Sequence, residues 1–244
     1  MSAGRPTALK PLDHKPDAEL RSLLTEHLSG FIGEDRRRRM DEVLGNRTRY
    51  LTAVLKDVYN SHNTSAVIRS CEALGIQDVH IIEKENRYRV NRQVTQGATR
   101  WLTLHRYRAR ERDPTETAIR YLKDAGYRLI GATPDADRVV DDDDLAVPTA
   151  VVFGTEIDGL SDQTREALDG TFRIPLYGFS QSLNLSVAAA TVLRTLTGTM
   201  RARGRDWRLS SEESADLRFA WYRRTIRESD VMVRRFIANM EAGD

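Results

Sequence analysis

Three short polar segments of the chain hold the residue types that could do chemistry. They are YNSHNTSAVIRS (59–70), FGTEIDGLS (153–161) and YGFSQSLNLS (177–186). Each combines neutral hydrogen-bonding side chains with serine or glycine, and their charged residues include Glu156 and Arg69. Amides, hydroxyls and exposed backbone suit a small ligand pocket. The spacing of His, Cys and Asp predicts no metal site.

The same polar residues have structural interpretations that the residues alone leave open. Amide and hydroxyl side chains cap helix N-termini well, and three of these residues suit that role: Asn63, Ser182 and Asn184. Arg69 lies in a mostly apolar segment, where an arginine commonly extends to solvent or pairs with an acid such as Glu72. Glu156 could place a negative charge at a helix N-terminus, and Cys71 suits a small core position.

Each polar segment follows a predicted strand and opens a predicted helix. The predicted strands are 51–58, 78–84, 127–133, 149–154 and 170–176. The predicted helices between and after them are 63–75, 114–126, 161–169 and 184–202, and residues 86–101 are predicted to be a loop. This alternation predicts an α/β fold with a mostly parallel sheet. Ligands bind at the carboxyl ends of the strands in such sheets, where the polar segments would meet. The glycine fingerprints of phosphate and dinucleotide loops are missing.

Helical segments flank this alternating region. Residues 17–32, 34–47 and 210–240 are predicted to be helical, and residues 1–16 are predicted to be a disordered arm. The chain has 244 residues and a single cysteine, which excludes an internal disulfide. We find neither an apolar run of membrane-spanning length nor a signal peptide. We therefore expect a cytoplasmic protein with no membrane partner.

Arginine is enriched at the two ends of the chain. Of 38 basic residues, 33 are arginine, although the net charge is only +2. One group is the run Arg36, Arg37, Arg38 and Arg39, and a second follows residue 200. Basic ends around a mixed centre indicate a polyanion partner, with solvated helix faces as the alternative.

The three polar segments together resemble a known family. HNTSAVIRSCEALG, VVFGTEIDGLS and IPLYGFSQSLNLSVAAA, in this order, resemble the three motifs of the SpoU/TrmH branch of the SPOUT RNA methyltransferases. RRRRMDEVLGNRTRYLTAVLKDV and QGATRW resemble its tRNA guanosine-18 2′-O-methyltransferases. The resemblance implies an α/β fold with a deep C-terminal trefoil knot, a homodimer, and S-adenosylmethionine as cofactor. It also implies three parts: an arm with a short helix (1–33), a methyltransferase domain beginning with the basic helix (34–209), and a helical extension (210–244).

The resemblance also implies roles for individual residues. The matching catalytic positions are Arg69, Asn63, Glu156, Ser182 and Asn184. The matching cofactor-binding positions are Thr133, Gly154, Ile174 and Leu183. The expected RNA-binding residues are Arg36, Arg37, Arg38, Arg39 and Arg100. Two positions depart from the family pattern, because Ser61 replaces a usual proline and Arg100 replaces a usual lysine.

The expected reaction is methyl transfer to a ribose 2′-hydroxyl of tRNA, at guanosine 18 of the D-loop. The alternatives are the same chemistry on ribosomal RNA, and a knotted RNA-binding protein without catalysis. The short segment before the shared region favours tRNA, because some relatives that modify ribosomal RNA carry an N-terminal RNA-binding domain. The presence of all five catalytic positions argues against a non-catalytic protein.

The helix at 184–202 gives a separate reason to expect a homodimer. It is apolar over much of its surface, and a helix with two apolar stripes must bury both. One stripe would cover the sheet, and the other, with Ala189, would meet a two-fold copy of itself.

Overall fold

The computed structural model describes residues 16–108, 113–139, 145–204 and 206–242, so the predicted arm at 1–16 lies almost entirely outside them. The chain divides into two compact units. The larger unit is Thr48–Trp207, and the smaller unit combines the two ends of the chain, Met1–Arg47 and Arg208–Asp244.

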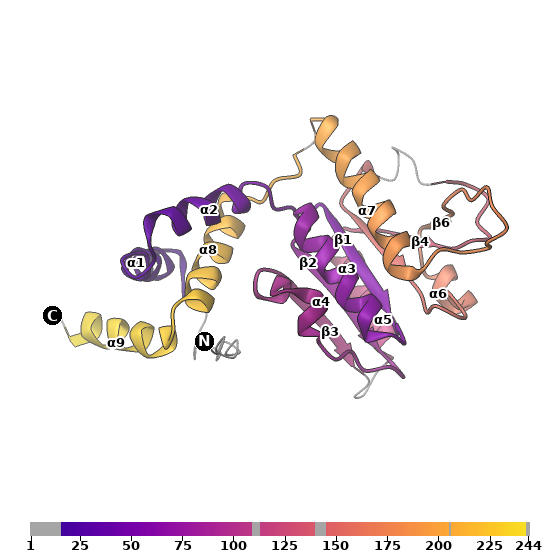
Figure 1. Ribbon diagram of the computed structural model, residues 1–244. Coiled ribbons are helices and arrows are strands. Elements are labelled where there is room, and N and C mark those ends of the chain that lie inside the picture. The colour runs from indigo at the N-terminus through magenta and orange to yellow at the C-terminus, as the bar shows by residue number, and fades with distance from the viewer. Residues whose placement is uncertain (1–15, 109–112, 140–144, 205, 243–244) are drawn as a thin grey trace. The chain divides into compact units, whose positions relative to one another are not determined.

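The larger unit is an α/β fold around a six-stranded sheet (Figure 1). The strands are β1 (Leu51–Lys56), β2 (Asp78–Glu83), β3 (Thr103–Arg108), β4 (Arg128–Ala132), β5 (Thr149–Phe153) and β6 (Gly170–Phe172). Their order is β3-β2-β1-β5-β4-β6, and every neighbouring pair is parallel. The five predicted strands are confirmed, and the sixth, β3, was missed.

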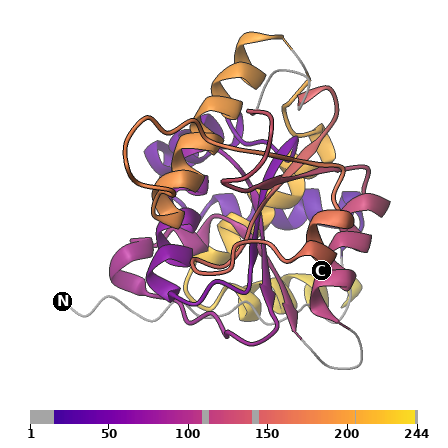
Figure 2. The same cartoon turned by 90° about the vertical axis from the view of Figure 1, so that its right-hand side faces the viewer.

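Helices cover both faces of this sheet. They are α3 (Ser61–Leu74), α4 (Arg92–Thr95), α5 (Pro114–Asp124), α6 (Asp162–Glu166) and α7 (Leu185–Ala202), with a short 3₁₀ helix η1 (Ala98–Arg100). In Figure 2, α7 lies to one side of the sheet and α5 and α6 lie to the other. The prediction that residues 86–101 form a loop is therefore wrong in part, because this segment contains α4 and η1.

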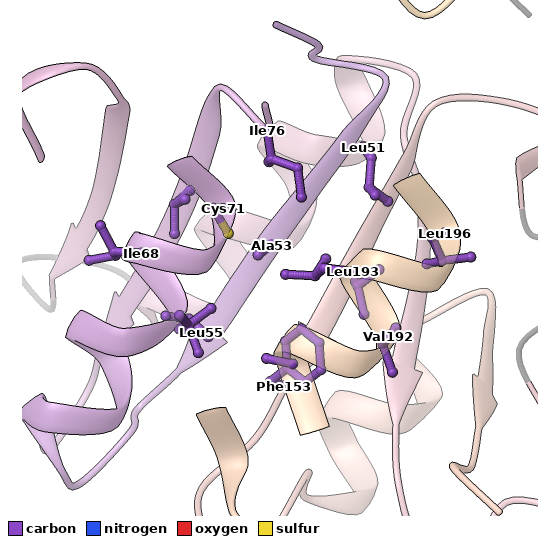
Figure 3. Packing of buried hydrophobic residues seen from close by; sticks show 14 of the residues in the cluster. Leu51, Ala53, Leu55, Ile68, Cys71, Ile76, Phe153, Val192, Leu193 and Leu196 are labelled. Atoms are coloured by element: carbon purple, nitrogen blue, oxygen red, sulfur yellow. The ribbon is translucent and has the colours of Figure 1, made fainter. Parts of the chain in front are cut away.

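The core fills the space on both faces because successive residues of a strand point to opposite sides. On β1, Ala53 and Leu55 belong to the cluster under α3 and α7, whereas Val54 belongs to the cluster under α5. Figure 3 shows the first cluster, where Leu193 of α7 and Cys71 of α3 lie beside the strands. The core interpretation of Cys71 is confirmed, since its side chain is fully buried.

Helix α7 buries a single stripe, not two. Its buried residues recur at helical spacing: Ala189, Val192, Leu193, Leu196, Thr197 and Met200. Ala189 is fully buried in the core cluster of the sheet, so its assignment to a dimer contact is wrong. The exposed positions of the helix are mainly polar, with Thr191, Arg194 and Thr195, and only Val187 is an exposed large apolar residue.

The smaller unit is helical. Its elements are α1 (Ala18–Ser29), α2 (Glu34–Leu44), α8 (Ser211–Thr225) and α9 (Ser229–Ala242). Helix α2, which we grouped with the central domain by sequence, packs against α8, and Asp41 pairs with Arg218 at 2.9 Å. Within the described residues, no helix has the length and hydrophobicity of a membrane span.

Many arginines of the smaller unit stabilise its own structure. Arg47 is buried and lies over the ring of Trp221, with its guanidinium carbon 5.5 Å from the ring centre. Two other arginines of the unit form ion pairs of 2.6 Å with carboxylates: Arg21 with Asp216, and Arg223 with Asp230. These three arginines are buried, so they form neither a solvated helix face nor a surface for a polyanion partner.

Candidate active site

The polar segments predicted from the sequence lie at one edge of the sheet. All strands are parallel, so their carboxyl ends share this edge. The turn after β1 leads into α3, the turn after β5 carries Glu156, and the long loop after β6 leads into α7. This edge is the usual ligand-binding region of an open α/β sheet.

A hydrogen-bond network joins all three segments. The Asn63 amide donates from Nδ2 to Glu156 Oε1 at 2.9 Å, and the Asn184 amide donates to Asn63 Oδ1 at 3.3 Å. Glu156 also accepts hydrogen bonds from the backbone N–H groups of Tyr59 and Asn60, at 3.2 and 3.3 Å. Both carboxylate oxygens are therefore engaged, and Glu156 fixes the turn between β1 and α3.

The structure separates the capping residues from those that bridge segments. Helix α3 is capped by the side chain of Asn60, which accepts from the N–H of His62, so the capping interpretation of Asn63 is wrong. Asn63 is buried and points instead into the network with Glu156. Asn184 does cap α7, because its Oδ1 accepts from the N–H of Ser186, while its amide nitrogen reaches Asn63.

Gly154 makes the turn after β5 possible. A Cβ atom at this position would lie 2.1 Å from the carbonyl oxygen of Gly159, far inside contact distance. The turn is closed by two backbone hydrogen bonds between Thr155 and Gly159, at 3.0 and 3.2 Å. The tight turn begins beside Gly154 and carries Glu156 toward α3.

The loop between β6 and α7 has the polar groups of a ligand pocket. Within the described part of the chain, residues 174–183 make no hydrogen bond. Their backbone donors and acceptors are therefore available to a ligand. Ile174 packs partly against the core, and Leu183 is 37% exposed, so the loop also offers apolar surface. Thr133 is buried directly after β4 and donates its N–H to Phe172 O at 2.9 Å.

Two of the predicted catalytic residues are not in the network. Arg69 lies exposed on α3, with no hydrogen bond or ion pair among the described residues. The alternative ion pair between Arg69 and Glu72 is not formed. Ser182 is exposed in the loop before α7 and makes no hydrogen bond within the described chain.

The predicted RNA-binding arginines divide between the two units. On α2, Arg38 pairs with Asp35 at 2.7 Å and Arg39 pairs with Glu42 at 3.0 Å. Arg36 and Arg37 form no ion pair with described residues. In the larger unit, half-buried Arg100 lies against the Trp101 ring, at 5.6 Å from its centre.

The sequence did not single out Asn60 or the backbone N–H groups that hold Glu156. A usable indication existed, because Asn-Ser after a strand is a strong helix start and would have placed the cap three residues earlier. Among the described residues, no group of three or more His, Cys, Asp or Glu side chains could hold a metal ion.

Fold and site together define an α/β protein with amide, carboxylate and backbone groups gathered at the carboxyl edge of a parallel sheet. Residues 50–194, more than half of the chain, match the profile of the SpoU rRNA Methylase family. The chain belongs to this family.

Individual relatives agree with this assignment. The tRNA (guanosine(18)-2′-O)-methyltransferase of Borreliella burgdorferi is 39% identical over 202 residues, which are 82% of this chain and 90% of the relative. The enzyme of the same name from Thermus thermophilus is 36% identical over 66% of this chain and 80% of its own. Among solved structures, the A. aeolicus TrmH/SpoU tRNA modifying enzyme superposes with a TM-score of 0.69 at 28% identity, covering 80% of this chain and 98% of that one.

Proposed function

We propose that this protein transfers a methyl group from S-adenosylmethionine to the ribose 2′-hydroxyl of guanosine 18 in tRNA. The observation that carries the proposal is the 39% identity to the Borreliella burgdorferi tRNA (guanosine(18)-2′-O)-methyltransferase across 82% of this chain. The geometry of the site supports the proposal, because hydrogen bonds between the three polar segments hold Asn63, Glu156 and Asn184 together.

The residues at the carboxyl edge fit the cofactor. Its adenosine and amino-acid parts need hydrogen-bond donors and acceptors, and the backbone of residues 174–183 offers groups that no other described residue uses. Ile174 and Leu183 would pack against the adenine, and Thr133 and Gly154 would line the strand ends beside it. When bound, the cofactor supplies an electrophilic methyl group for direct transfer.

The chain's own residues would align the ribose and stabilise the negative charge that develops on it during the reaction. Glu156 and Asn184 position Asn63, whose amide would orient the ribose or the guanidinium of Arg69. Side chains on a helix lean toward its N-terminus, so Arg69 leans toward the end of α3 that carries Asn63. An arginine keeps its proton, so Arg69 would act by binding an RNA phosphate and stabilising the negative charge that develops on the 2′-oxygen. Ser182 stands in the loop beside them as a further hydroxyl donor.

The proposal includes two finer features of the fold. The loop after β6 and helix α7 would form the deep trefoil knot expected of the SPOUT class, which is a rare exception to unthreaded chain paths. The smaller helical unit would serve as an RNA-binding extension, in which Arg36 and Arg37 form no ion pair with described residues.

A methylation assay tests the proposed function. Purified protein is incubated with S-adenosylmethionine labelled on the methyl group and with a tRNA transcript, and the modified nucleotide is located by mass spectrometry. We expect label on guanosine 18 and no label on a transcript carrying 2′-deoxyguanosine at that position. Transfer to ribosomal RNA fragments but not to tRNA would overturn the proposal in favour of the alternative substrate.

We also propose a homodimer that joins two copies of the larger unit through an apolar rim around the site. The rim consists of exposed large apolar residues on the turns at the carboxyl edge and on the first turn of α7: Tyr59, Ile157, Tyr177, Phe179 and Val187. Ile157 is 89% exposed and Tyr177 is 97% exposed, which is unusual for large apolar side chains and typical of an interface. A two-fold copy of the same surface is the commonest partner for such a patch.

The apolar rim gives a direct test of the dimer. Replacing Ile157 and Phe179 together by serine should shift the protein from dimer to monomer in sedimentation velocity at micromolar concentration. The matched control is Val231→Ser, which removes an exposed apolar side chain of α9. A wild-type protein that sediments as an active monomer, or a double variant that stays fully dimeric, would contradict this interface.

A further inference from the structure

We propose that the loop after β2 is a second RNA-backbone contact of the larger unit. The loop spans residues 84–91 and leads into α4, and three exposed arginines lie here beside the candidate active site: Arg87 and Arg89 in the loop, and Arg92 at the start of α4. The inference rests on the proposed function for the identity of the bound RNA. The inference adds a positively charged surface beside the candidate active site, which none of the sequence motifs indicated.

The start of the loop is held by one buried carboxylate. Asp57 Oδ1 accepts hydrogen bonds from three successive backbone N–H groups, those of residues 84, 85 and 86, at 3.0, 2.9 and 2.8 Å. The Asn86 side chain donates back to the carbonyl of Asp57 at 3.1 Å. Asp57 has a φ of 53°, a left-handed conformation that Asp tolerates better than most residues. The end of β1 and the start of the loop are therefore fixed to each other.

The middle of the loop alternates between buried and exposed residues. Tyr88 is buried, its N–H donates to Glu83 Oε1 at 2.8 Å, and its hydroxyl lies 3.1 Å from Ser65 Oγ. Its neighbours Arg87 and Arg89 are exposed. Because Tyr88 is anchored inward, the two arginine side chains are directed to solvent on either side of it.

The loop is also tied to the helix that carries the candidate catalytic residues. The N–H of Arg89 donates to Ser61 Oγ at 3.3 Å, and the N–H of Asn91 donates to Ser65 Oγ at 3.2 Å. Ser61 and Ser65 flank Asn63 on the first turns of α3. The arginines of the loop therefore keep a fixed position relative to the network of Asn63.

Nearby acidic groups do not neutralise these arginines. Glu83 is fully buried and pairs with Arg106 and Arg108. Burial alone would raise the pKa of Glu83, but the hydrogen bonds from these two arginines outweigh it and hold the pKa below its usual value. Asp57 is occupied by backbone N–H groups, as described above. Among the described residues, Arg87, Arg89 and Arg92 form no ion pair, and neither does Glu85.

An RNA backbone is the partner that this surface fits. Exposed guanidinium groups bind phosphates through paired N–H donors, and such contacts fix the position of a nucleic acid without reading its sequence. A ribose that enters the site must bring its neighbouring phosphates across the same edge of the sheet. The rigid loop would hold these phosphates and so align the ribose with the network around Asn63.

Removal of two of these charges tests the proposal. The variant Arg87→Ala/Arg89→Ala is compared with the control Arg120→Ala/Lys123→Ala, which removes the same charge from exposed positions on α5. Binding of a tRNA transcript is measured by filter binding across a salt titration, and binding of S-adenosylhomocysteine is measured by calorimetry. Each lost phosphate contact should reduce the slope of log affinity against log salt by roughly 0.7–0.9, so the double variant should lose about 1.5.

The outcomes separate this inference from the proposed function. We expect weaker tRNA binding and a shallower salt slope for the loop variant, with no change in the control or in cofactor binding. An unchanged slope in the loop variant, or an equal loss in the control, would overturn the inference. A wild-type protein that binds RNA through this loop but does not methylate tRNA would overturn the proposed function and leave the loop contact standing.

Discussion

Arg69→Ala should lower the rate of methyl transfer to tRNA by about 10³-fold, equivalent to roughly 4 kcal/mol of transition-state stabilisation. Arg69 is the exposed cation on the helix that carries Asn63, and no described residue pairs with it. Its charge is therefore available to a phosphate and to the developing negative charge on the ribose oxygen. Because the side chain is exposed and makes no hydrogen bond or ion pair with described residues, cofactor affinity and thermal stability should stay at the wild-type level.

Three measurements distinguish a catalytic role from a structural one. Single-turnover transfer to tRNA reports the chemical step, calorimetry with S-adenosylhomocysteine reports the pocket, and thermal unfolding reports the fold. Arg120→Ala is the matched control, since it removes an exposed arginine from a helix on the opposite face of the sheet. Equal losses of activity, cofactor affinity and stability in Arg69→Ala would show that the arginine has a structural role.

Four of the five strands that the sequence predicted, β1, β2, β4 and β5, are largely buried. In β1 and β5, nearly all residues are buried and most are apolar, because helices cover both faces of the sheet. Strand β3, which pairs only with β2 at one end of the sheet, was missed because of its composition. Its residues are half-buried or exposed, and its histidine, tyrosine and arginines give no apolar run. An end strand of this kind is stabilised by its backbone pairing and by ring contacts with its neighbours.

The site was predicted by residue type more than by geometry. Polar segments at strand ends located Asn63, Glu156 and Asn184 at a common edge, because a parallel sheet brings them there. The hydrogen bond between Asn63 and Glu156 joins residues 93 positions apart in the chain, and no local pattern encodes it. Asn60, which caps α3, was not distinguished from Asn63, which does not, although Asn-Ser after the strand indicated the earlier helix start.

The sequence predicted where arginines are enriched but not which of them form contacts within the protein. Arginines in one stretch of sequence have different roles in the structure. Arg47 is buried on Trp221, Arg38 and Arg39 form surface ion pairs, and Arg36 and Arg37 have no partner among the described residues. The arginines of the loop after β2 are scattered through a mixed segment, so no run marked them. Their lack of neutralising partners becomes visible only once the nearby carboxylates are placed.

Gly154→Ala should lower S-adenosylmethionine affinity and methyl transfer by about 100-fold each. The new methyl group would lie 2.1 Å from the Gly159 carbonyl oxygen and 2.7 Å from the backbone nitrogen of Leu160. Both neighbours are backbone atoms, so the turn itself must move. That movement would displace Glu156 and with it Asn63, since the carboxylate holds the entry to α3. A displacement of about 1 Å in a site that aligns two reacting groups is enough for a loss of this size.

Gly33→Ala is the matched control for this turn. Gly33 precedes α2 in the smaller unit, and an added Cβ would meet no atom within 4 Å. Its backbone does not have the positive φ that favours glycine. The control should therefore keep wild-type cofactor affinity in calorimetry, whereas Gly154→Ala should not. Far-ultraviolet circular dichroism at 25 °C establishes that both variants are folded. A folded Gly154→Ala protein with wild-type affinity and activity would show that the turn after β5 does not determine the geometry of the pocket, and Glu156 would lose its assigned positioning role.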